Sequence, residues 1–317
     1  MDQKSGIKIV DATMRDGGLV NDFYFEDDLV KALYQTNLTT GVDYMEFGYK
    51  ASKRMFDPAQ NGKWKYCDDE NIRAIVGENK TDLKVAVMAD VGRCDYQEDF
   101  LPKSESPIDM IRVATYLDTV DGAVSMIEDA AKKGYEVSCN VMAISRSEQY
   151  DLRGALETIA KTQASVLYVV DSYGALYPDQ AKRLVDTYLD VAAKYGKQVG
   201  MHAHNNLQLA FSNTMLAHEL GATWLDGTYD AMGRGAGNCA MELLLGYLEK
   251  KGYEKYKMAP ALPFLDRYME GLKRKGVVWG YDTQYLLTGL LNQHPRAAIE
   301  FTKEGRIDHD AFLREIE

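Results

Sequence analysis

A short apolar strand followed by a helix recurs along the 317-residue chain, and this rhythm limits the fold more than any other feature. Alternating or continuous apolar runs predict the strands, and apolar residues spaced i, i+3, i+4 predict the helices. Strands are predicted at 7–14, 42–49, 84–90, 109–116, 136–144, 166–172, 198–204 and 223–229. Helices are predicted at 26–38, 68–78, 121–134, 151–162, 178–196, 207–221 and 239–252. Eight strands in about 250 residues, all but the third followed by a predicted helix, predict a (β/α)8 TIM barrel.

Two other observations define the architecture further. A doubly wound open sheet is the alternative, but it more often has five to seven strands, and no Gly-x-Gly-x-x-Gly follows the first strand. The strand–helix alternation stops near residue 252, and the remaining chain looks helical in the segments 263–276, 283–293 and 309–317. We therefore predict a barrel catalytic domain at 1–252 and a small helical C-terminal appendage at 253–317.

Composition excludes several classes of protein. The net charge of −11 leaves no basic stripe for phosphates, so no nucleic-acid partner is expected. No run of 18 apolar residues and no signal-peptide core are present, so no membrane association is expected. The four cysteines are too widely spaced for a disulfide framework or a zinc knuckle. A reduced, cytoplasmic protein is the simplest interpretation.

Two histidines at the end of the seventh predicted strand form a candidate metal site. His202 and His204 are two residues apart, so on a strand they project from the same face and can share a divalent metal. Without another ligand they are only a polar pair at a strand end. Asp16, next to Arg15, follows the first strand, which in a barrel is separated from the seventh only by the eighth. The sequence thus predicts a three-ligand site of Asp16, His202 and His204 at the C-terminal mouth.

The same motifs carry a family resemblance. The segments DATMRDGG (11–18), YMEFGY (44–49), VVDSYGALYP (169–178), HAHNN (202–206) and GRGAGN (233–238) occur in this order. Together they resemble the DRE-TIM metallolyases, a superfamily of aldolases, lyases and synthases, and most closely its 4-hydroxy-2-oxovalerate aldolase-like branch. The resemblance spans nearly the whole predicted barrel.

The resemblance implies a role for each matching residue. Asp16, His202 and His204 would bind a divalent metal, usually Mn²⁺ or Mg²⁺, and Asn238 would be a further ligand in some branches. The donor types alone would also suit Zn²⁺ or Co²⁺. Arg15 would stabilise the enolate oxygen of a pyruvate-like 2-oxo acid.

Further residues are implied at the same rim. Glu46 would hold Arg15 or a water, or would act only as a buried partner of Arg15. Asp171, Ser172 and Gly174 would join Arg15 in binding substrate. In the appendage, Tyr285 matches a proton-donating tyrosine of the aldolase branch, although a packing role is the simpler alternative.

The chain also departs from the family pattern. Leu19 stands where the aldolase branch carries a histidine base, so the base is missing or comes from elsewhere. His294 could replace it only if the appendage folds over the barrel mouth. The loop before Asn238 lacks the cysteine of hydroxymethylglutaryl-CoA lyase, and Cys239 beside it is expected to be a packing residue.

We expect a metal-dependent aldolase that acts on a 4-hydroxy-2-oxo acid and releases pyruvate and an aldehyde. Two alternatives stay open: a Claisen-type synthase that joins an acyl-CoA to a 2-oxo acid, and a barrel that binds metal and metabolite without turnover. Barrels of this kind often dimerise, so a homodimer is also an expectation.

Overall fold

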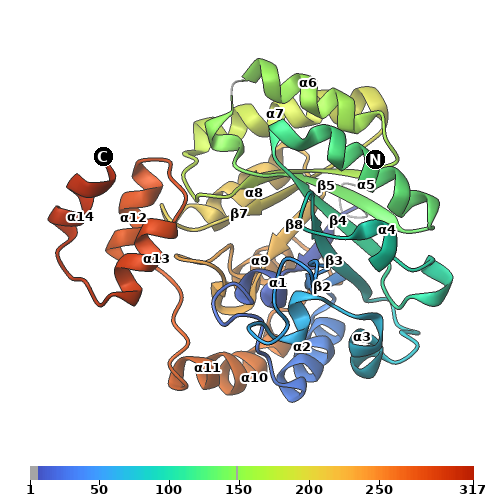
Figure 1. Cartoon of the computed structure of the whole chain (residues 1–317), viewed down its shortest axis with the longest axis horizontal. Coiled ribbons are helices and arrows are strands. Elements are labelled where there is room, and N and C mark those ends of the chain that lie inside the picture. Colours follow the sequence, from blue (N-terminus) through green and yellow to red (C-terminus); the bar gives the residue numbers. More distant parts are fainter. Residues whose placement is uncertain (1–5, 148) are drawn as a thin grey trace.

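The computed structural model describes residues 6–147 and 149–317 and contains a closed barrel of eight parallel strands (Figure 1). The strands are β1 (Lys8–Asp11), β2 (Tyr44–Tyr49), β3 (Lys84–Asp90), β4 (Met110–Thr115), β5 (Glu136–Val141), β6 (Val166–Asp171), β7 (Gln198–Ala203) and β8 (Trp224–Gly227). They pair in sequence order, and β8 pairs with β1 to close the barrel. The predicted TIM barrel is confirmed.

Helices surround the barrel on its outside (Figure 1). They are α2 (Asp27–Thr40), α3 (Asp69–Val76), α4 (Tyr96–Asp99), α5 (Val120–Lys132), α6 (Gln149–Ala160), α7 (Pro178–Tyr195), α8 (Ala210–Leu220) and α9 (Met241–Lys250). Local sequence explains their limits: α7 begins at Pro178, whose fixed φ suits a first turn, and ends before Gly196 in the left-handed conformation. The short helix α4 follows β3, after which no helix was predicted.

The apolar core has two layers. Val10, Tyr44, Tyr168 and Trp224 belong to the group of side chains that fills the barrel interior. A larger group packs the outer faces of the strands against the helices. Gly200 is needed in the inner layer, because an added Cβ would lie 2.5 Å from the ring of Tyr168. Higher in the barrel, charged side chains replace the apolar ones and form the floor of the mouth.

One boundary differs from the prediction in a way that matters for the site. The first strand ends at Asp11 rather than residue 14, and a short helix, α1 (Thr13–Gly17), follows it. The backbone N–H of Thr13 donates to Oδ1 of Asp11 over 2.9 Å, which turns the chain out of the strand. Arg15 and Asp16 therefore lie on a helical turn above the barrel and not in a strand extension.

The C-terminal helices form a separate group beside the barrel, red at the left of Figure 1. After a helical stretch made of α10 (Leu262–Phe264), a π-turn (Leu265–Met269) and α11 (Glu270–Arg274), the chain forms α12 (Thr283–Leu290), α13 (Arg296–Lys303) and α14 (His309–Ile316). The last three helices share a small core of Ala298, Phe301 and Phe312. The sequence did not predict α13. The division of the chain into domains at residue 252 stays a prediction.

The appendage is fastened to loops at the C-terminal ends of three barrel strands. Asn292 Nδ2 donates to the carbonyl of Ser145 after β5, and Asn206 Nδ2, after β7, donates to the carbonyl of Tyr285. The indole of Trp279 donates to the carbonyl of Asp230 after β8. The appendage therefore packs on the mouth side of the barrel.

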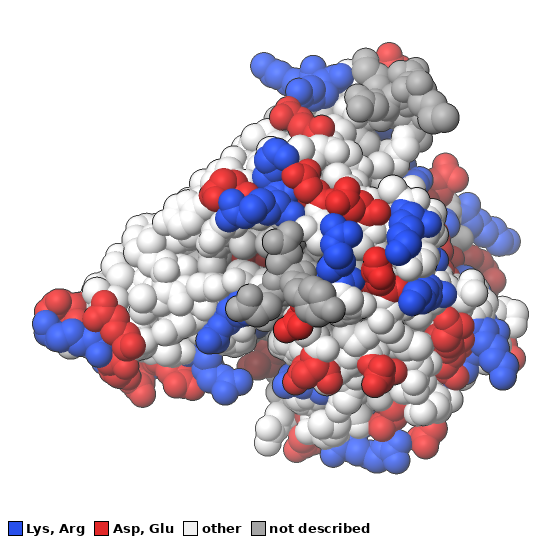
Figure 2. Space-filling view, turned by 90° about the horizontal axis from the view of Figure 1, so that it is seen from above, with Lys and Arg blue, Asp and Glu red and all other residues white. Residues whose placement is uncertain are grey.

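The surface is mixed in charge. Figure 2 shows acidic and basic side chains interspersed over the face it presents. Within the described residues, every helix is too short or too polar to cross a membrane.

Candidate active site

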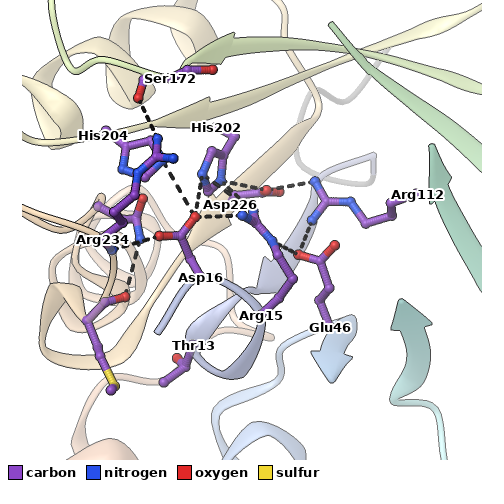
Figure 3. Close-up of polar contacts among 12 residues, drawn as sticks. Thr13, Arg15, Asp16, Glu46, Arg112, Ser172, His202, His204, Asp226 and Arg234 are labelled. Atoms are coloured by element: carbon purple, nitrogen blue, oxygen red, sulfur yellow. Dashed lines mark hydrogen bonds and ion pairs between the residues drawn. The ribbon is translucent and has the colours of Figure 1, made fainter. Parts of the chain in front are cut away.

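Asp16, His202 and His204 meet at the mouth of the barrel (Figure 3). Oδ2 of Asp16 lies 3.6 Å from Nε2 of His202 and 3.5 Å from Nε2 of His204. Each residue has one potential ligand atom that lies within 4.8 Å of those of the other two. All three side chains are buried. These side chains, predicted from separate parts of the sequence, form one cluster whose donor types and spacing suit a divalent metal.

A fourth oxygen lies next to this cluster. The side chain of Asn238 is buried, and within the described part of the chain its Oδ1 has no hydrogen-bond partner. A Cβ on Gly233 would lie 2.0 Å from Nδ2 of Asn238 and 2.7 Å from Oδ1 of Asp16, so glycine lets the loop after β8 approach both. A buried carbonyl oxygen without a donor costs free energy, and a metal ion would satisfy it. The residues present therefore fit the divalent metal that the family resemblance implies.

Asp16 is held from two sides. The backbone N–H of Arg234 donates to Oδ1 of Asp16 over 3.0 Å, and Nη1 of Arg15 donates to Oδ2 over 2.5 Å. Burial alone would raise the pKa of the Asp16 carboxyl, but the charge of Arg15 and a hydrogen bond with His202 hold it well below its usual range. The group is thus a carboxylate, the form that binds metal.

The two histidines differ in their surroundings. Burial is the main cause that lowers the pKa of His204 to about 3, so this imidazole is neutral and has a free lone pair. Burial and Arg15 also oppose the charged form of His202, but hydrogen bonds to Asp16 and Asp226 outweigh them and raise its pKa. A metal would have to displace a proton from His202 in part of the pH range.

A chain of buried charges runs beneath the cluster. Nδ1 of His202 lies 3.0 Å from Oδ2 of Asp226, which accepts a 2.7 Å hydrogen bond from Arg112. Arg112 donates to Oε2 of Glu46 over 2.7 Å, and Arg15 Nε donates to the same oxygen over 2.9 Å. Two guanidinium groups and two carboxylates alternate, so each buried charge has an opposite neighbour.

The guanidinium of Arg15 contacts two carboxylates and the ring of His202. Nε and Nη1 are used by Glu46 and Asp16, while Nη2 faces the ring of His202 at 3.4 Å from Nε2. An imidazole nitrogen that binds metal has no lone pair left for this N–H. Nη2 is therefore the nitrogen of this guanidinium that has no carboxylate partner among the described residues.

The predicted substrate-binding residues of the β6 loop have structural contacts. Both carboxylate oxygens of Asp171 accept backbone N–H groups, from Ala175 and Leu176. Ser172 Oγ accepts the N–H of Ala143, and its carbonyl faces the guanidinium of Arg234. Gly174, at φ +57°, allows the loop to touch the chain just after His204. These residues shape one wall of the mouth, and direct contact with substrate stays a prediction.

The appendage residues fall into two groups. Tyr285 packs against the small core of the last helices and against Gly235, and burial raises the pKa of its hydroxyl. Its proton-donor role stays a prediction. His294 does reach the mouth: its Nε2 lies 3.1 Å from Nη1 of Arg234, and its ring packs edge-on against Tyr173. Leu19, in the position of the missing histidine, packs against the main core.

Three site residues were missed by sequence reasoning: Arg112, Asp226 and Arg234. Arg112 and Asp226 each stand in the middle of an apolar strand, where a buried charge requires a partner. That signal was available in the sequence. For Arg234 the loop was noticed, but the contact of its side chain depends on the docked appendage.

The fold and the cluster define a TIM-barrel enzyme with a candidate metal centre at its C-terminal mouth. The chain belongs to the HMGL-like family, whose model matches residues 6–264. The resemblance to DRE-TIM metallolyases is thereby confirmed, and lyase chemistry is the coarse function that this family supports.

Known relatives agree with the family. The chain is 29% identical over 313 residues to a 4-hydroxy-2-oxovalerate aldolase of Bacillus cereus, covering 95% of this chain and 88% of that protein. It is 29% identical over 249 residues to an oxaloacetate decarboxylase of Mycobacterium tuberculosis, covering 77% and 70%.

Solved structures confirm the fold. The N-terminal domain of a Bacteroides vulgatus protein, whose assignment as an aldolase is provisional, superposes with a TM-score of 0.80 at 27% identity, covering 98% of this chain and all of that one. The carboxyl transferase domain of Rhizobium etli pyruvate carboxylase gives a TM-score of 0.71 at 15% identity, over 96% of this chain and 54% of that one. The second likeness, at this low identity, shows the fold alone.

Proposed function

We propose that this enzyme cleaves a carbon–carbon bond of a 2-oxo acid and that the reaction passes through the enolate of pyruvate. A divalent metal would be held by Asp16, His202 and His204, with Asn238 beside it. One observation carries the proposal: Arg15 donates to the metal-ligating carboxylate of Asp16, and its Nη2 faces the same space as the ligands. Two positive charges would then converge where an oxyanion develops.

The bond changes are those of a retro-aldol reaction. A base takes the proton of the C4 hydroxyl, the C3–C4 bond breaks, and its electron pair forms the enolate with negative charge on the C2 oxygen. The metal, when bound, supplies Lewis-acid stabilisation of that oxygen. Arg15 stabilises the same charge by a hydrogen bond from Nη2. Protonation at C3 then completes pyruvate, and the C4 fragment leaves as an aldehyde.

Glu46 acts as a positioning residue in this scheme. Its Oε2 accepts from both Arg15 and Arg112, so it fixes the guanidinium of Arg15 without reaching the substrate. The metal is expected to be Mn²⁺ or Mg²⁺, since carboxylate and amide oxygens supply half of the four candidate ligands. Zn²⁺ and Co²⁺ stay open for the same donor set.

The two named relatives are compatible with one intermediate. Retro-aldol cleavage of a 4-hydroxy-2-oxo acid and decarboxylation of oxaloacetate both break the C3–C4 bond and leave the pyruvate enolate. The proposal therefore covers the 2-oxo acid half of the substrate and leaves the departing half to experiment. The cytoplasmic location and the homodimer stay predictions.

The test is pyruvate release, coupled to lactate dehydrogenase, by metal-stripped protein with Mn²⁺, Mg²⁺ or no metal added. Above the enzyme-free rate, which for oxaloacetate includes spontaneous and metal-promoted decarboxylation, a panel of 4-hydroxy-2-oxo acids and oxaloacetate should yield pyruvate only with metal. Arg15→Gln should lower kcat by about 10²- to 10³-fold and leave Mn²⁺ bound. Arg153→Gln, on the exposed side of α6, is the control and should keep the wild-type rate.

Two results would count against the proposal. A wild-type rate in Arg15→Gln would remove the enolate role of Arg15. No pyruvate from any substrate, with Mn²⁺ bound, would contradict the lyase reaction and favour the synthase alternative.

A further inference from the structure

Arg234 spans the mouth above the metal cluster. Its backbone N–H holds Asp16, and its side chain extends past His204 to donate from Nη2 to the carbonyl of Ser172 over 3.1 Å (Figure 3). The proposed reaction uses only the backbone of this residue. The guanidinium therefore needs another explanation.

His294 meets that guanidinium from the appendage. It lies between α12 and α13, in the part of the appendage fastened by Asn292 to the loop after β5. Its Nδ1 accepts the backbone N–H of Arg296 over 3.1 Å, and a backbone amide can only donate. Burial and the charges of Arg234 and Arg296 lower the pKa of His294 to about 4, so the ring is neutral. The proton of a neutral ring must then sit on Nε2.

This assignment brings two donors together. Nε2–H of His294 lies 3.1 Å from Nη1 of Arg234, which is also a donor and cannot lose its proton at neutral pH. Nε of Arg234 is buried and has no hydrogen-bond partner within residues 6–147 and 149–317. Two donors, Nη1–H of Arg234 and Nε2–H of His294, therefore face one place with no acceptor between them, and among the described residues only Nη2 of this guanidinium has an acceptor.

We propose that Arg234 and His294 together bind a carboxylate of the 2-oxo acid. A carboxylate has two oxygens with several lone pairs, and the planar fork of a guanidinium matches it. One oxygen can accept from Arg234 and the other from Nε2–H of His294, which turns two opposed donors into a receptor. This inference rests on the proposed function for the identity of the ligand, and it adds the residues that select it.

The receptor would accept one of two carboxylates. Every 2-oxo acid has a carboxylate next to its keto group, and a dicarboxylic 2-oxo acid has a second one at the far end. The side chain of Arg234 lies beside His204, across the cluster from Arg15 (Figure 3). Binding at the far carboxylate would make the enzyme selective for dicarboxylic substrates.

Two stable acids of equal length separate these cases. Titration calorimetry of the full-length, Mn²⁺-loaded protein should be run with 2-oxopentanoate, which has one carboxylate, and 2-oxoglutarate, which has two. Arg234→Gln should weaken 2-oxoglutarate binding by about 10- to 100-fold, as expected for a lost charge-assisted hydrogen bond. An equal loss for 2-oxopentanoate identifies the carboxylate beside the keto group, and an unchanged 2-oxopentanoate affinity identifies the far one.

Variants of His294 test the second donor. His294→Phe keeps an aromatic ring but removes the N–H, and it should weaken the same acid that Arg234→Gln weakens. His294→Gln restores an N–H donor and should recover part of the affinity. Lys303→Gln removes an exposed positive charge from α13 and is the control, with an expected change below about threefold. Mn²⁺ affinity should equal that of the wild type in all four variants, which shows that the cluster is intact.

The possible failures are distinguishable. Wild-type affinity for both acids in Arg234→Gln overturns the receptor and leaves the proposed function standing. If the wild type binds neither 2-oxo acid but binds glutarate in an Arg234-dependent way, the receptor is supported and the proposed function is contradicted. If it binds none of the three acids, both proposals fail.

Discussion

Nδ1 of His202 donates a hydrogen bond to Oδ2 of Asp226 across 3.0 Å, from inside the barrel. A carboxylate can only accept, so this contact assigns the proton to Nδ1 and leaves Nε2 to face Asp16. Outer partners of this kind orient metal-ligating histidines and raise their basicity. Asp226 thus determines that Nε2 of His202, and not Nδ1, is available to bind a metal.

Replacing Asp226 with asparagine should therefore weaken metal binding. The side chain keeps its shape but loses its charge, so its contact with Nδ1 of His202 is weaker and the ring is less basic. We expect Mn²⁺ affinity, measured by titration calorimetry, to fall by about 10- to 100-fold. Asp190→Asn, at an exposed position on α7, is the control. Equal affinity in the two variants would show that Asp226 does not orient the ligand.

Metal binding should also depend on pH in a definite direction. Burial and Arg15 disfavour the charged ring, but Asp16 and Asp226 raise the pKa of His202 above its ordinary value of 6.5. Below that raised pKa a proton competes with metal for Nε2, so Mn²⁺ affinity should fall by up to about tenfold per pH unit. Asp226→Asn removes one cause of the raised pKa, and the fall should then begin at lower pH. A flat profile between about pH 5.5 and 8 would contradict this competition.

Arg112 should contribute more to the free energy of unfolding than an arginine that forms an ion pair at the surface. It is fully buried and bridges Glu46 and Asp226, so Arg112→Met leaves two buried carboxylates with fewer partners. The expected loss in free energy of unfolding is about 3–5 kcal/mol. Arg153→Met breaks an exposed pair with Asp190 and should cost about 0–1 kcal/mol. Urea unfolding of both variants measures the difference, and similar costs would argue against a buried network.

Two glycine substitutions should have opposite effects. Gly174 has φ +57°, and an added Cβ would lie 2.5 Å from the backbone nitrogen of Asn206, so Gly174→Ala should destabilise by about 1–3 kcal/mol. Gly154 is exposed inside α6 with open space around it, so Gly154→Ala should stabilise by about 0.4–1 kcal/mol. The order of the two melting temperatures is the test. Should Gly174→Ala prove the more stable variant, the close approach of the two loops would be wrong.

The barrel could be predicted because its signal is local. Each strand and helix has its own periodicity, and eight repetitions leave little room for another fold. The cluster of Asp16, His202 and His204 could be predicted for a related reason. In a barrel the order of the strands determines which strand ends lie near one another. The strand order therefore predicts that these residues, far apart in the sequence, are close in space.

Other parts of the site depend on tertiary contacts that no local pattern records. The turn into α1 follows from a hydrogen bond between Thr13 and Asp11, which the apolar run through residue 14 conceals. The position of Arg234 in a loop gave no hint of its partner, because His294 reaches it only through the docking of helices that follow the barrel. The helix α13 is a different case, because Ala298 and Phe301 mark a buried face at helical spacing and the prediction overlooked them.

The cluster of Asp16, His202 and His204 can form only after β8 has paired with β1 and closed the barrel. Asp16 and His202 come from opposite ends of the barrel sequence, and Asp16 is completed by the backbone of Arg234, which follows the last strand. A nascent or partly folded chain with an open barrel has no site at which these three residues meet. High-affinity metal capture should therefore be the last event of folding, and binding of Mn²⁺ would report a closed barrel in each molecule.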